Sequence, residues 1–159
     1  MPPLFSIVLP SLNAGAYLER ALRSVLAQAG DDTEVIVVDG GSTDGSVEVV
    51  RSMAADAAGS NAPSALFQEP ERGGDFRTLE LPNSRTLFHW CSDPDGGQSE
   101  ALNKGFARAS GKYLLWINAD DLLLPGTLDR ARNYLAAHPA CDWLAGNLVY
   151  IDEQDRVLW

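Results

Sequence analysis

Positive charge is scarce in this sequence of 159 residues, which has 12 lysines and arginines against 22 aspartates and glutamates and a formal net charge of −10. Nucleic acids and anionic lipid surfaces need a positively charged partner, so neither is expected to bind nonspecifically. A phosphate-bearing ligand would need local help from backbone N–H groups, a few basic side chains or a divalent cation. The excess of carboxylates favours the cation.

Long apolar runs are also absent, because no stretch approaches the roughly 18 residues of a membrane-spanning helix. Residues 1–4 lead into an apolar segment without the basic region and cleavage site of a secretory signal. We therefore expect a cytoplasmic protein without a transmembrane segment, either free or held peripherally at the inner face of the membrane. The two cysteines, Cys91 and Cys141, lack metal-type spacing, and buried reduced thiols are a better expectation than a disulfide.

Apolar runs and helical periodicities alternate along the chain and predict one α/β domain over residues 1–159, with an open, mainly parallel sheet and helices on both faces. Short, continuous apolar runs predict buried strands at 5–10 and 34–39, strand character returns at 85–90, and residues 113–117 predict a core strand. Helices are expected from Asn13, its N-cap, to Gly30, over 44–58 with Ser42 or Thr43 as the cap, over 98–109, and from Pro125 to His138.

Two segments do not follow this alternation. Residues 59–84 are rich in Gly, Ser, Pro and Asn and predict a long loop or an inserted hairpin. Residues 143–151 and 157–159 have strand character and flank a turn at 152–155. We expect two further strands there.

Polar residues follow each predicted parallel strand, at the edge where open α/β sheets bind ligands. The four ends are Pro10-Ser11-Leu12-Asn13, residues 39–45, residues 92–98, and Asn118-Ala119-Asp120-Asp121. Asp and Asn also cap helices and form turns, and Asn13, Asp44 and Asp93 suit that role at least as well. Asp39 differs because it directly follows four apolar residues and precedes two glycines, which favours a contact with a ribose or a base N–H.

The glycines after Asp39 do not form a known phosphate loop. Residues 39–45 match neither G-x-G-x-x-G nor the Walker pattern, and no P-loop lysine follows them. Dinucleotide binding and P-loop hydrolysis are therefore disfavoured.

Asp120 and Asp121 are adjacent acids at the end of the hydrophobic strand predicted at 113–117. Two close negative charges are unfavourable unless a positive group lies near them, and hard oxygen ligands select Mg²⁺, Mn²⁺ or Ca²⁺ over zinc. The alternative is that these acids only decorate the N-terminus of the helix that begins near Pro125. We predict a divalent cation site with Asp120 and Asp121 as ligands.

These segments together resemble the family 2 glycosyltransferases of the GT-A fold, in order and spacing, from Phe5 to about Trp159. The segments that carry the resemblance are 6–13, 17–18, 24–28, 34–45, 95–105 and 118–121. The resemblance implies a nucleotide-diphospho-sugar donor, Mn²⁺ or Mg²⁺ at a D-x-D-type motif, and inversion at the anomeric carbon. It also implies a carbohydrate or lipid-linked acceptor, as in polysaccharide biosynthesis.

The family pattern also assigns residues to the donor site. By this resemblance, the donor nucleotide contacts Pro10, Ser11, Asn13, Asp39, Asp95, Gln98, Lys104, Asn118 and Ala119. Asn118-Ala119-Asp120 aligns with D-x-D, so Asp120 is the expected direct metal ligand and Asp121 the helper. The usual Asp-Asp-Gly-Ser is Asp39-Gly40-Gly41-Ser42 here, so one acidic nucleoside contact is absent. A UDP-sugar is the first expectation for the donor, with GDP- and dTDP-sugars as alternatives.

The catalytic base of this family lies beyond the metal motif, and none of Asp142, Asp152 and Glu153 is assigned to that role. The chain is therefore expected to be an N-terminal, nucleotide-sugar-binding portion, truncated in its acceptor-binding part. A noncatalytic nucleotide-sugar-binding module remains an alternative. A sugar nucleotidyltransferase is a second alternative, but residues 10–15 lack the glycine-rich, basic loop that such enzymes use.

Overall fold

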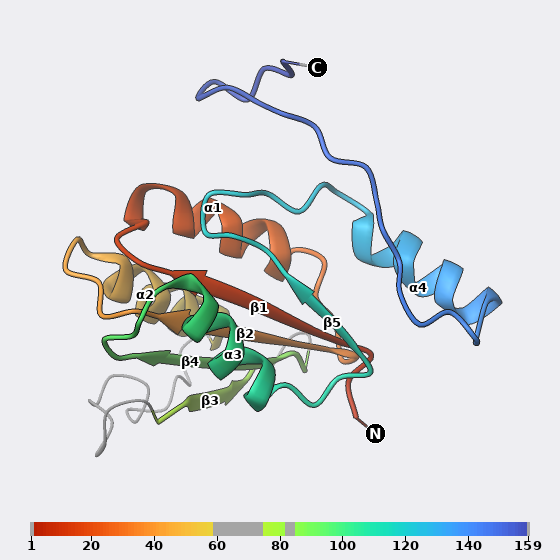
Figure 1. Cartoon of the computed structure of the whole chain (residues 1–159), viewed down its shortest axis with the longest axis horizontal. Coiled ribbons are helices and arrows are strands. Elements are labelled where there is room, and N and C mark those ends of the chain that lie inside the picture. Colours follow the sequence, from red (N-terminus) through yellow and green to blue (C-terminus); the bar gives the residue numbers. More distant parts are fainter. Residues whose placement is uncertain (1, 59–74, 82–84, 159) are drawn as a thin grey trace. The chain divides into compact units, whose positions relative to one another are not determined.

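A computed structural model describes residues 2–58, 75–81 and 85–158, and the described chain divides into two compact units, Met1–Leu128 and Asp129–Trp159 (Figure 1). The first unit contains a five-stranded sheet with the strand order β3-β4-β2-β1-β5. The strands are β1 (Phe5–Ser11), β2 (Thr33–Asp39), β3 (Arg77–Glu80), β4 (Leu87–Ser92) and β5 (Tyr113–Trp116). The single domain predicted over 1–159 and its C-terminal truncation remain predictions.

The sheet is parallel except at one edge. β1 pairs in parallel with β2 and β5, β2 pairs in parallel with β4, and β3 pairs antiparallel with β4. Every residue of β1 and β2 is buried, which explains their continuous apolar runs. The predicted α/β class with a mainly parallel sheet is therefore confirmed.

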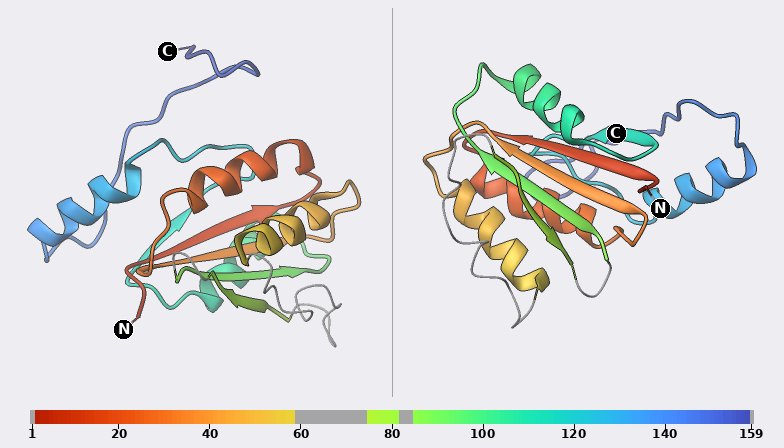
Figure 2. Two further views of the ribbon diagram at one scale, coloured as in Figure 1. Left: turned by 180° about the vertical axis from the view of Figure 1, so that it is seen from behind. Right: turned by 90° about the horizontal axis from the view of Figure 1, so that it is seen from below.

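Helices cover both faces of this sheet, as predicted. Helices α1 (Gly15–Leu26) and α2 (Ser46–Ala58) lie on one face, and α3 (Gln98–Arg108) lies on the other (Figure 2). The cluster under α3 joins Val8, Ile36 and Val38 of the central strands to Cys91 and Ala101. A side-chain carbon at Gly105 would lie 2.3 Å from Val8 Cγ1, so glycine lets α3 approach the sheet closely.

The predicted helix caps are wrong. Residue 14, not Asn13, is the N-cap of α1, and Asn13 has a left-handed backbone with φ of 50°. Helix α2 begins at Ser46, and the carbonyl of Gly45 accepts the N–H of Val49. Ser42 and Thr43 therefore do not cap α2, because both contact the loop after β1 instead.

Only residues 75–81 of the predicted loop or hairpin at 59–84 are described. Residues Arg77–Glu80 form β3, whose register pairs Leu79 with Phe88. The described part is thus one strand of an antiparallel pair with β4. The remainder of the prediction lies outside the described residues.

The second unit is described by itself. Helix α4 (Thr127–Ala137) extends into it from the end of the first unit. The strands predicted at 143–151 and 157–159 are wrong for the described residues, where Ile151 and Val157 form only an isolated antiparallel bridge. The turn between them is confirmed, because Asp152 accepts the N–H groups of Gln154 and Arg156 at 2.9 Å each.

Neither cysteine forms a disulfide. The thiol of Cys91 is buried, as expected, whereas Cys141 is only partly buried. Within residues 2–58, 75–81 and 85–158, no helix has the length and apolar character needed to cross a bilayer.

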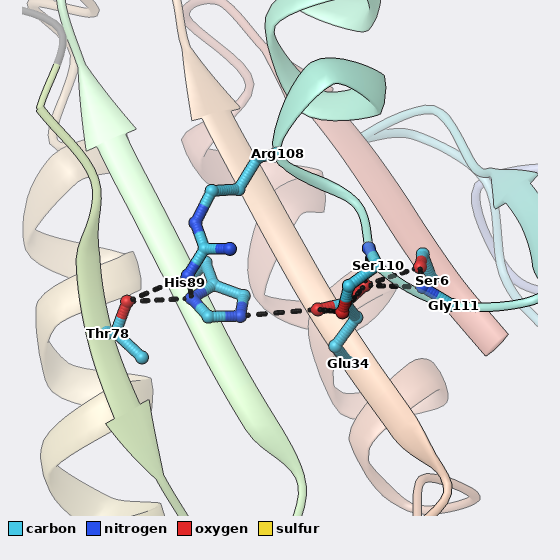
Figure 3. A network of polar contacts seen from close by, with 7 residues as sticks. All are labelled: Ser6, Glu34, Thr78, His89, Arg108, Ser110 and Gly111. Atoms are coloured by element: carbon cyan, nitrogen blue, oxygen red, sulfur yellow. Dashed lines mark hydrogen bonds and ion pairs between the residues drawn. The ribbon is translucent and has the colours of Figure 1, made fainter. Parts of the chain in front are cut away.

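A buried carboxylate, Glu34, ties α3 to the first strands of the sheet. Glu34 is inaccessible to solvent, and its carboxylate accepts hydrogen bonds from Ser6 Oγ, from the N–H and Oγ of Ser110, and from the N–H of Gly111 at 3.0 Å (Figure 3). Burial alone would raise the pKa of Glu34, but these hydrogen bonds outweigh it and lower the pKa. Glu34 is therefore an ionised, fully bonded anchor for the chain that follows α3.

His89 extends this arrangement to the other side of β2. Its Nδ1 accepts from Arg108 Nη2 at 3.0 Å and lies 2.8 Å from Thr78 Oγ1, and its Nε2 lies 3.4 Å from Glu34 Oε2. Burial, and then the charge of Arg108, lower the pKa of His89, although Glu34 opposes this shift. Arg108 only donates, so His89 is neutral with its proton on Nε2, facing Glu34. We call these residues the Glu34 network: Ser6, Glu34, Thr78, His89, Arg108, Ser110 and Gly111.

Candidate functional site

The carboxyl ends of the parallel strands meet at one edge of the sheet, as the sequence predicted. Ser11, Asp39 and Ser92 are the last residues of β1, β2 and β4, and they stand opposite one another in register. Strand β5 continues on the other side of β1, where the N–H of Ile117 donates to the carbonyl of Val8. We call these strand ends and the loops that follow them the carboxyl edge.

The loops after β1 and β2 are joined by hydrogen bonds. The N–H of Asn13 donates to Ser42 Oγ at 2.8 Å, and Asn13 Oδ1 accepts the N–H of Thr43 at 2.9 Å. The N–H of Gly15 donates to Asp44 Oδ2 at 3.0 Å. Hydrogen bonds from Ser46 and from Gly15 lower the pKa of Asp44. Asn13 thus holds the two loops together, which suits an asparagine because its side chain tolerates the left-handed backbone.

Asp39 is closed to solvent, with 1% of its surface exposed. Its carboxylate accepts from the N–H groups of Gly41 and Ser42 at 3.1 and 2.9 Å, from Ser42 Oγ, and from Ser92 Oγ at 2.7 Å. Three of these donors reach Oδ2 and one reaches Oδ1, so the carboxylate is well bonded and keeps one acceptor position on Oδ1. Asp39 fixes the backbone of the edge, and the nucleoside contact predicted for it remains a prediction.

Asp95 is only half satisfied. Its Oδ1 accepts the N–H of Gly97 at 2.8 Å, whereas its Oδ2 is shielded from solvent and has no hydrogen-bond partner among the described residues. Ser11 Oγ, at the end of β1, is a second shielded oxygen without such a partner. Buried polar atoms are almost always hydrogen-bonded in folded proteins. Two unpartnered oxygens at one edge are typical of a site that receives a ligand.

The start of α3 carries a charged pair beside Asp95. Glu100 Oε2 accepts the N–H of Gly96 at 2.8 Å, and Glu100 Oε1 lies 3.2 Å from Lys104 Nζ. The bond from Gly96, and then Lys104, lower the pKa of Glu100. Burial alone would lower the pKa of Lys104, but Glu100, Asp95 and Asp93 raise it overall. The positive charge of Lys104 is therefore already partly compensated by carboxylates.

Asn118 organises the turn after β5. Its Oδ1 accepts from Gln98 Nε2 at 2.7 Å and from Trp116 Nε1 at 3.2 Å, and its Nδ2 donates to Asp121 Oδ2 at 2.8 Å. The structure thus brings together three residues predicted for the site: Gln98, Asn118 and Asp121. Both lone pairs of the Asn118 oxygen are in use, so this oxygen is not a free ligand for a cation.

Asp120 projects differently from its neighbours. It is exposed, and its carboxylate makes no hydrogen bond or ion pair with a described residue, whereas the adjacent Ala119 is buried. Within the described ranges, no group of three His, Cys, Asp or Glu side chains gathers as a metal cage. Mg²⁺ characteristically uses one or two carboxylates and completes its shell with water and substrate phosphates. Asp120, helped by Asp121, fits that limited role.

Pro10 is less accessible than its predicted role suggests. It is buried within β1, opposite Val38. Serines missed by the sequence analysis contribute more to the shape of the edge: Ser42 and Ser92 donate to Asp39, and Ser46 Oγ accepts the N–H of Ala14 at 3.1 Å. The sequence feature that could have indicated these serines is their position, directly after a strand or at the start of a helix.

Solved structures with this architecture identify the fold of the chain. TarS from S. aureus, in a structure of residues 1–349 with UDP-GlcNAc, has a TM-score of 0.59 and 22% identity over 87% of this chain and 32% of that one. A mannosyltransferase from Pyrobaculum calidifontis, solved with GDP-Man and Mn²⁺, has a TM-score of 0.57 and 24% identity over 86% of this chain and 33% of that one. The chain has the GT-A glycosyltransferase fold.

The family follows from the sequence match. Residues 6–74 and 83–157 match the family described as "Glycosyl transferase family 2", and the chain belongs to it. A "PGL/p-HBAD biosynthesis glycosyltransferase" of Mycobacterium bovis is 31% identical over 92% of this chain. "Glycosyltransferase GlyG" of Streptococcus pneumoniae is 28% identical over 98% of it. The chain spans about half the length of these relatives, 47% and 42% respectively.

Proposed function

We propose that the carboxyl edge binds the nucleoside diphosphate half of a nucleotide-sugar donor, and that the protein transfers the sugar with inversion to a carbohydrate or lipid-linked acceptor. The observation that carries the proposal is the set of incompletely bonded acidic groups, Asp95 and Asp120, held at this edge by saturated neighbours. Family membership and the nucleotide-sugar complexes of two structures with this fold support it.

Asp120, with Asp121 beside it, is the proposed holder of Mn²⁺ or Mg²⁺. The ion, when bound, would neutralise negative charge on the departing nucleoside diphosphate. The protein's own contribution is to hold the turn at 118–121 against α3 through the bond between Gln98 and Asn118. Exposure of Asp120 leaves its carboxylate accessible to an ion that a diphosphate shares.

The donor is proposed to be a UDP-sugar, with GDP- and dTDP-sugars as alternatives. One calorimetric series tests this: UDP, GDP and dTDP are titrated into the chain with and without Mn²⁺. We expect at least one nucleotide to bind, and to bind more tightly with Mn²⁺. Absence of binding for all three, in both conditions, would overturn the proposal.

The same series tests the metal assignment through Asp120→Ala. The matched control is Asp31→Ala, which removes another exposed acid just before β2, at the opposite edge of the sheet. We expect Asp120→Ala to abolish the gain from Mn²⁺, and Asp31→Ala to preserve it. Equal Mn²⁺ dependence in both variants would exclude Asp120 as the ligand and leave nucleotide binding intact as a proposal.

Transfer is tested separately from binding. A panel of nucleotide sugars is incubated with the chain, and release of the nucleoside diphosphate is followed. Release from one sugar nucleotide would identify the donor. Tight binding without release from any of them would favour a nucleotide-sugar-binding module for this chain, which is the alternative that the sequence left open.

A further inference from the structure

Gly40 occupies a position where the backbone itself does not require glycine. It is absent from the residues with positive φ, which include its neighbour Gly41 with φ of 84°. Its N–H donates to the carbonyl of Ser11 at 2.9 Å, so the peptide is fixed against the end of β1. The absence of a side chain at residue 40 therefore needs an explanation outside the local backbone.

The explanation lies in Asp95. A side-chain carbon at Gly40 would lie 3.1 Å from Asp95 Oδ1, 3.2 Å from Oδ2 and 3.3 Å from Cγ. The carboxylate of Asp95 thus covers the bare face of Gly40 at a distance that few real side-chain carbons tolerate. The N–H of Gly97 also donates to Asp95 Oδ1 at 2.8 Å. The carboxylate of Asp95 is therefore fixed by a hydrogen bond and lies against Gly40.

In this position, one oxygen of the Asp95 carboxylate is left without a hydrogen-bond donor. Asp95 Oδ2 is shielded from solvent and lacks a hydrogen-bond partner within the described residues. A carboxylate oxygen so placed is costly unless a hydrogen-bond donor reaches it. A phosphate supplies no donor and repels a carboxylate, so the partner that fits is an N–H or O–H group on the nucleoside half of a ligand.

We infer that Gly40 is a positioning residue, which admits the Asp95 carboxylate to the end of β2 and so lets it accept a hydrogen bond from the nucleoside. The inference rests on the proposed function and adds a size constraint to it. Residue 40 must be small because Asp95 supplies the carboxylate at this point of the edge. Two donors satisfy the chemistry: the ring N–H of a base such as uracil or guanine, and the 2′-hydroxyl of the ribose.

A double-mutant cycle on nucleotide binding tests the coupling between the two residues. UDP affinity in the presence of Mn²⁺ is measured for wild type, Gly40→Ala, Asp95→Ala and the double variant. We expect each single variant to bind about tenfold or more weakly, since each loses a charge-assisted hydrogen bond. In the Asp95→Ala background, Gly40→Ala should change affinity less than about twofold, because the carboxylate it displaces is gone.

Gly146→Ala is the matched control, because a side-chain carbon there meets nothing within 4 Å. Thermal unfolding of every variant reports whether the fold survives. If Gly40→Ala fails to fold, the double variant should restore folding, since the crowding disappears with the Asp95 carboxylate. Failure of that rescue, or equal losses from Gly40→Ala in both backgrounds, overturns the inference.

Two further ligands identify the donor group. CDP lacks the N–H at N3 that UDP offers, and dUDP lacks the 2′-hydroxyl. Wild type should discriminate against one of them by about tenfold or more, and Gly40→Ala should lose that discrimination. Equal binding of all three ligands by wild type would overturn the inference but not nucleotide binding. If none of UDP, GDP and dTDP bound, the proposed function itself would be overturned, and the inference with it.

Discussion

The Glu34 network and the carboxyl edge hold carboxylates at opposite ends of the same strands, and they differ in how completely these carboxylates are bonded. Glu34 is inaccessible and accepts from Ser6, Ser110 and Gly111. At the carboxyl edge, Asp39 accepts four hydrogen bonds, whereas Asp120 has no protein partner among the described residues. Carboxylates of one sheet therefore have different roles: some hold the fold together, and others are available to a ligand.

Saturation separates the two roles in physical terms. A carboxylate that accepts several backbone N–H groups fixes the segments that donate them, and its removal leaves those donors buried and unpaired. A carboxylate without protein partners contributes little to the fold and keeps its charge for a ligand. The comparison predicts that substitution of Glu34 should cost the most stability and substitution of Asp120 the least. Nucleotide binding should instead depend most on the acids that are incompletely hydrogen-bonded.

The largest loss of stability is expected for Glu34→Leu. The change removes the acceptor of the Ser110 N–H and of the Ser6 hydroxyl, whereas the N–H of Gly111 keeps Ser6 Oγ at 2.7 Å as an acceptor. Each buried donor left without an acceptor costs about 1–3 kcal/mol, and Ser6 is more deeply buried than the donors at Asp39. Urea unfolding measures the free energy, with Glu34→Gln as the control that retains one acceptor oxygen and should lose less. Equal stability of Glu34→Leu and wild type would mean that the network does not anchor α3.

Asp39→Ala should rank second. It removes the acceptor for two backbone N–H groups and two serine hydroxyls at the end of β2. We expect a loss of about 2–3 kcal/mol, because the loop is closer to solvent than the Glu34 network and water replaces part of the lost bonding. The same unfolding experiment measures this loss. Asp39→Asn keeps one acceptor oxygen, so its stability should lie between those of wild type and Asp39→Ala. A loss no greater than that of Asp31→Ala would contradict the anchoring role.

The different hydrogen bonding of Asp39 and Asp120 could not be predicted from the sequence. Each is an acid at the end of an apolar strand, and both strands were predicted in the right place because the apolar runs Val35–Val38 and Tyr113–Trp116 are visible in the sequence itself. What distinguishes the two acids is their donors. Ser92, which donates to Asp39, lies 53 residues away along the chain. Bonding of this kind depends on the tertiary arrangement, which periodicity does not report.

The apolar segment at 143–151 shows the opposite kind of error, a strand that was predicted but does not form. Its composition favours a strand, yet the structure forms only the bridge between Ile151 and Val157. A strand needs a paired neighbour to satisfy its backbone, and an isolated pair is marginal in water. Helix α3 was predictable because its inner face, including Ala101 and Phe106, is set by local spacing and packs on the cluster under it. Elements that complete themselves locally are thus easier to predict than elements that depend on partners.

Acid should weaken the Glu34 network in two steps. The folded state lowers the pKa of His89 through burial and Arg108, so the unfolded chain takes up a proton that the folded chain resists, and stability is lost as pH falls below the ordinary value of 6.5. The pKa of Glu34 is also lowered by its hydrogen bonds, so a further loss begins below 4.5. Urea unfolding between about pH 8 and about pH 3 measures both steps.

Variants assign the first of these steps to its residue. In His89→Phe the loss near pH 6.5 should disappear, whereas the control His138→Ala, which removes the other histidine, should keep it. A loss that persists in His89→Phe would place the titrating group elsewhere. Stability that rises as the pH falls through this range would contradict the sign itself.

The smallest effect on stability is expected for Asp120→Ala, because the exposed carboxylate bonds to no described residue. Its unfolding curve should overlay that of wild type, since surface substitutions away from special features are nearly neutral. Its loss of Mn²⁺-dependent nucleotide binding should nevertheless exceed that of Glu34→Gln, measured where both variants are folded. If Asp120→Ala destabilised the fold as much as Asp39→Ala does, Asp120 would belong with the structural acids, and incomplete bonding would no longer mark the ligand-binding end of the sheet.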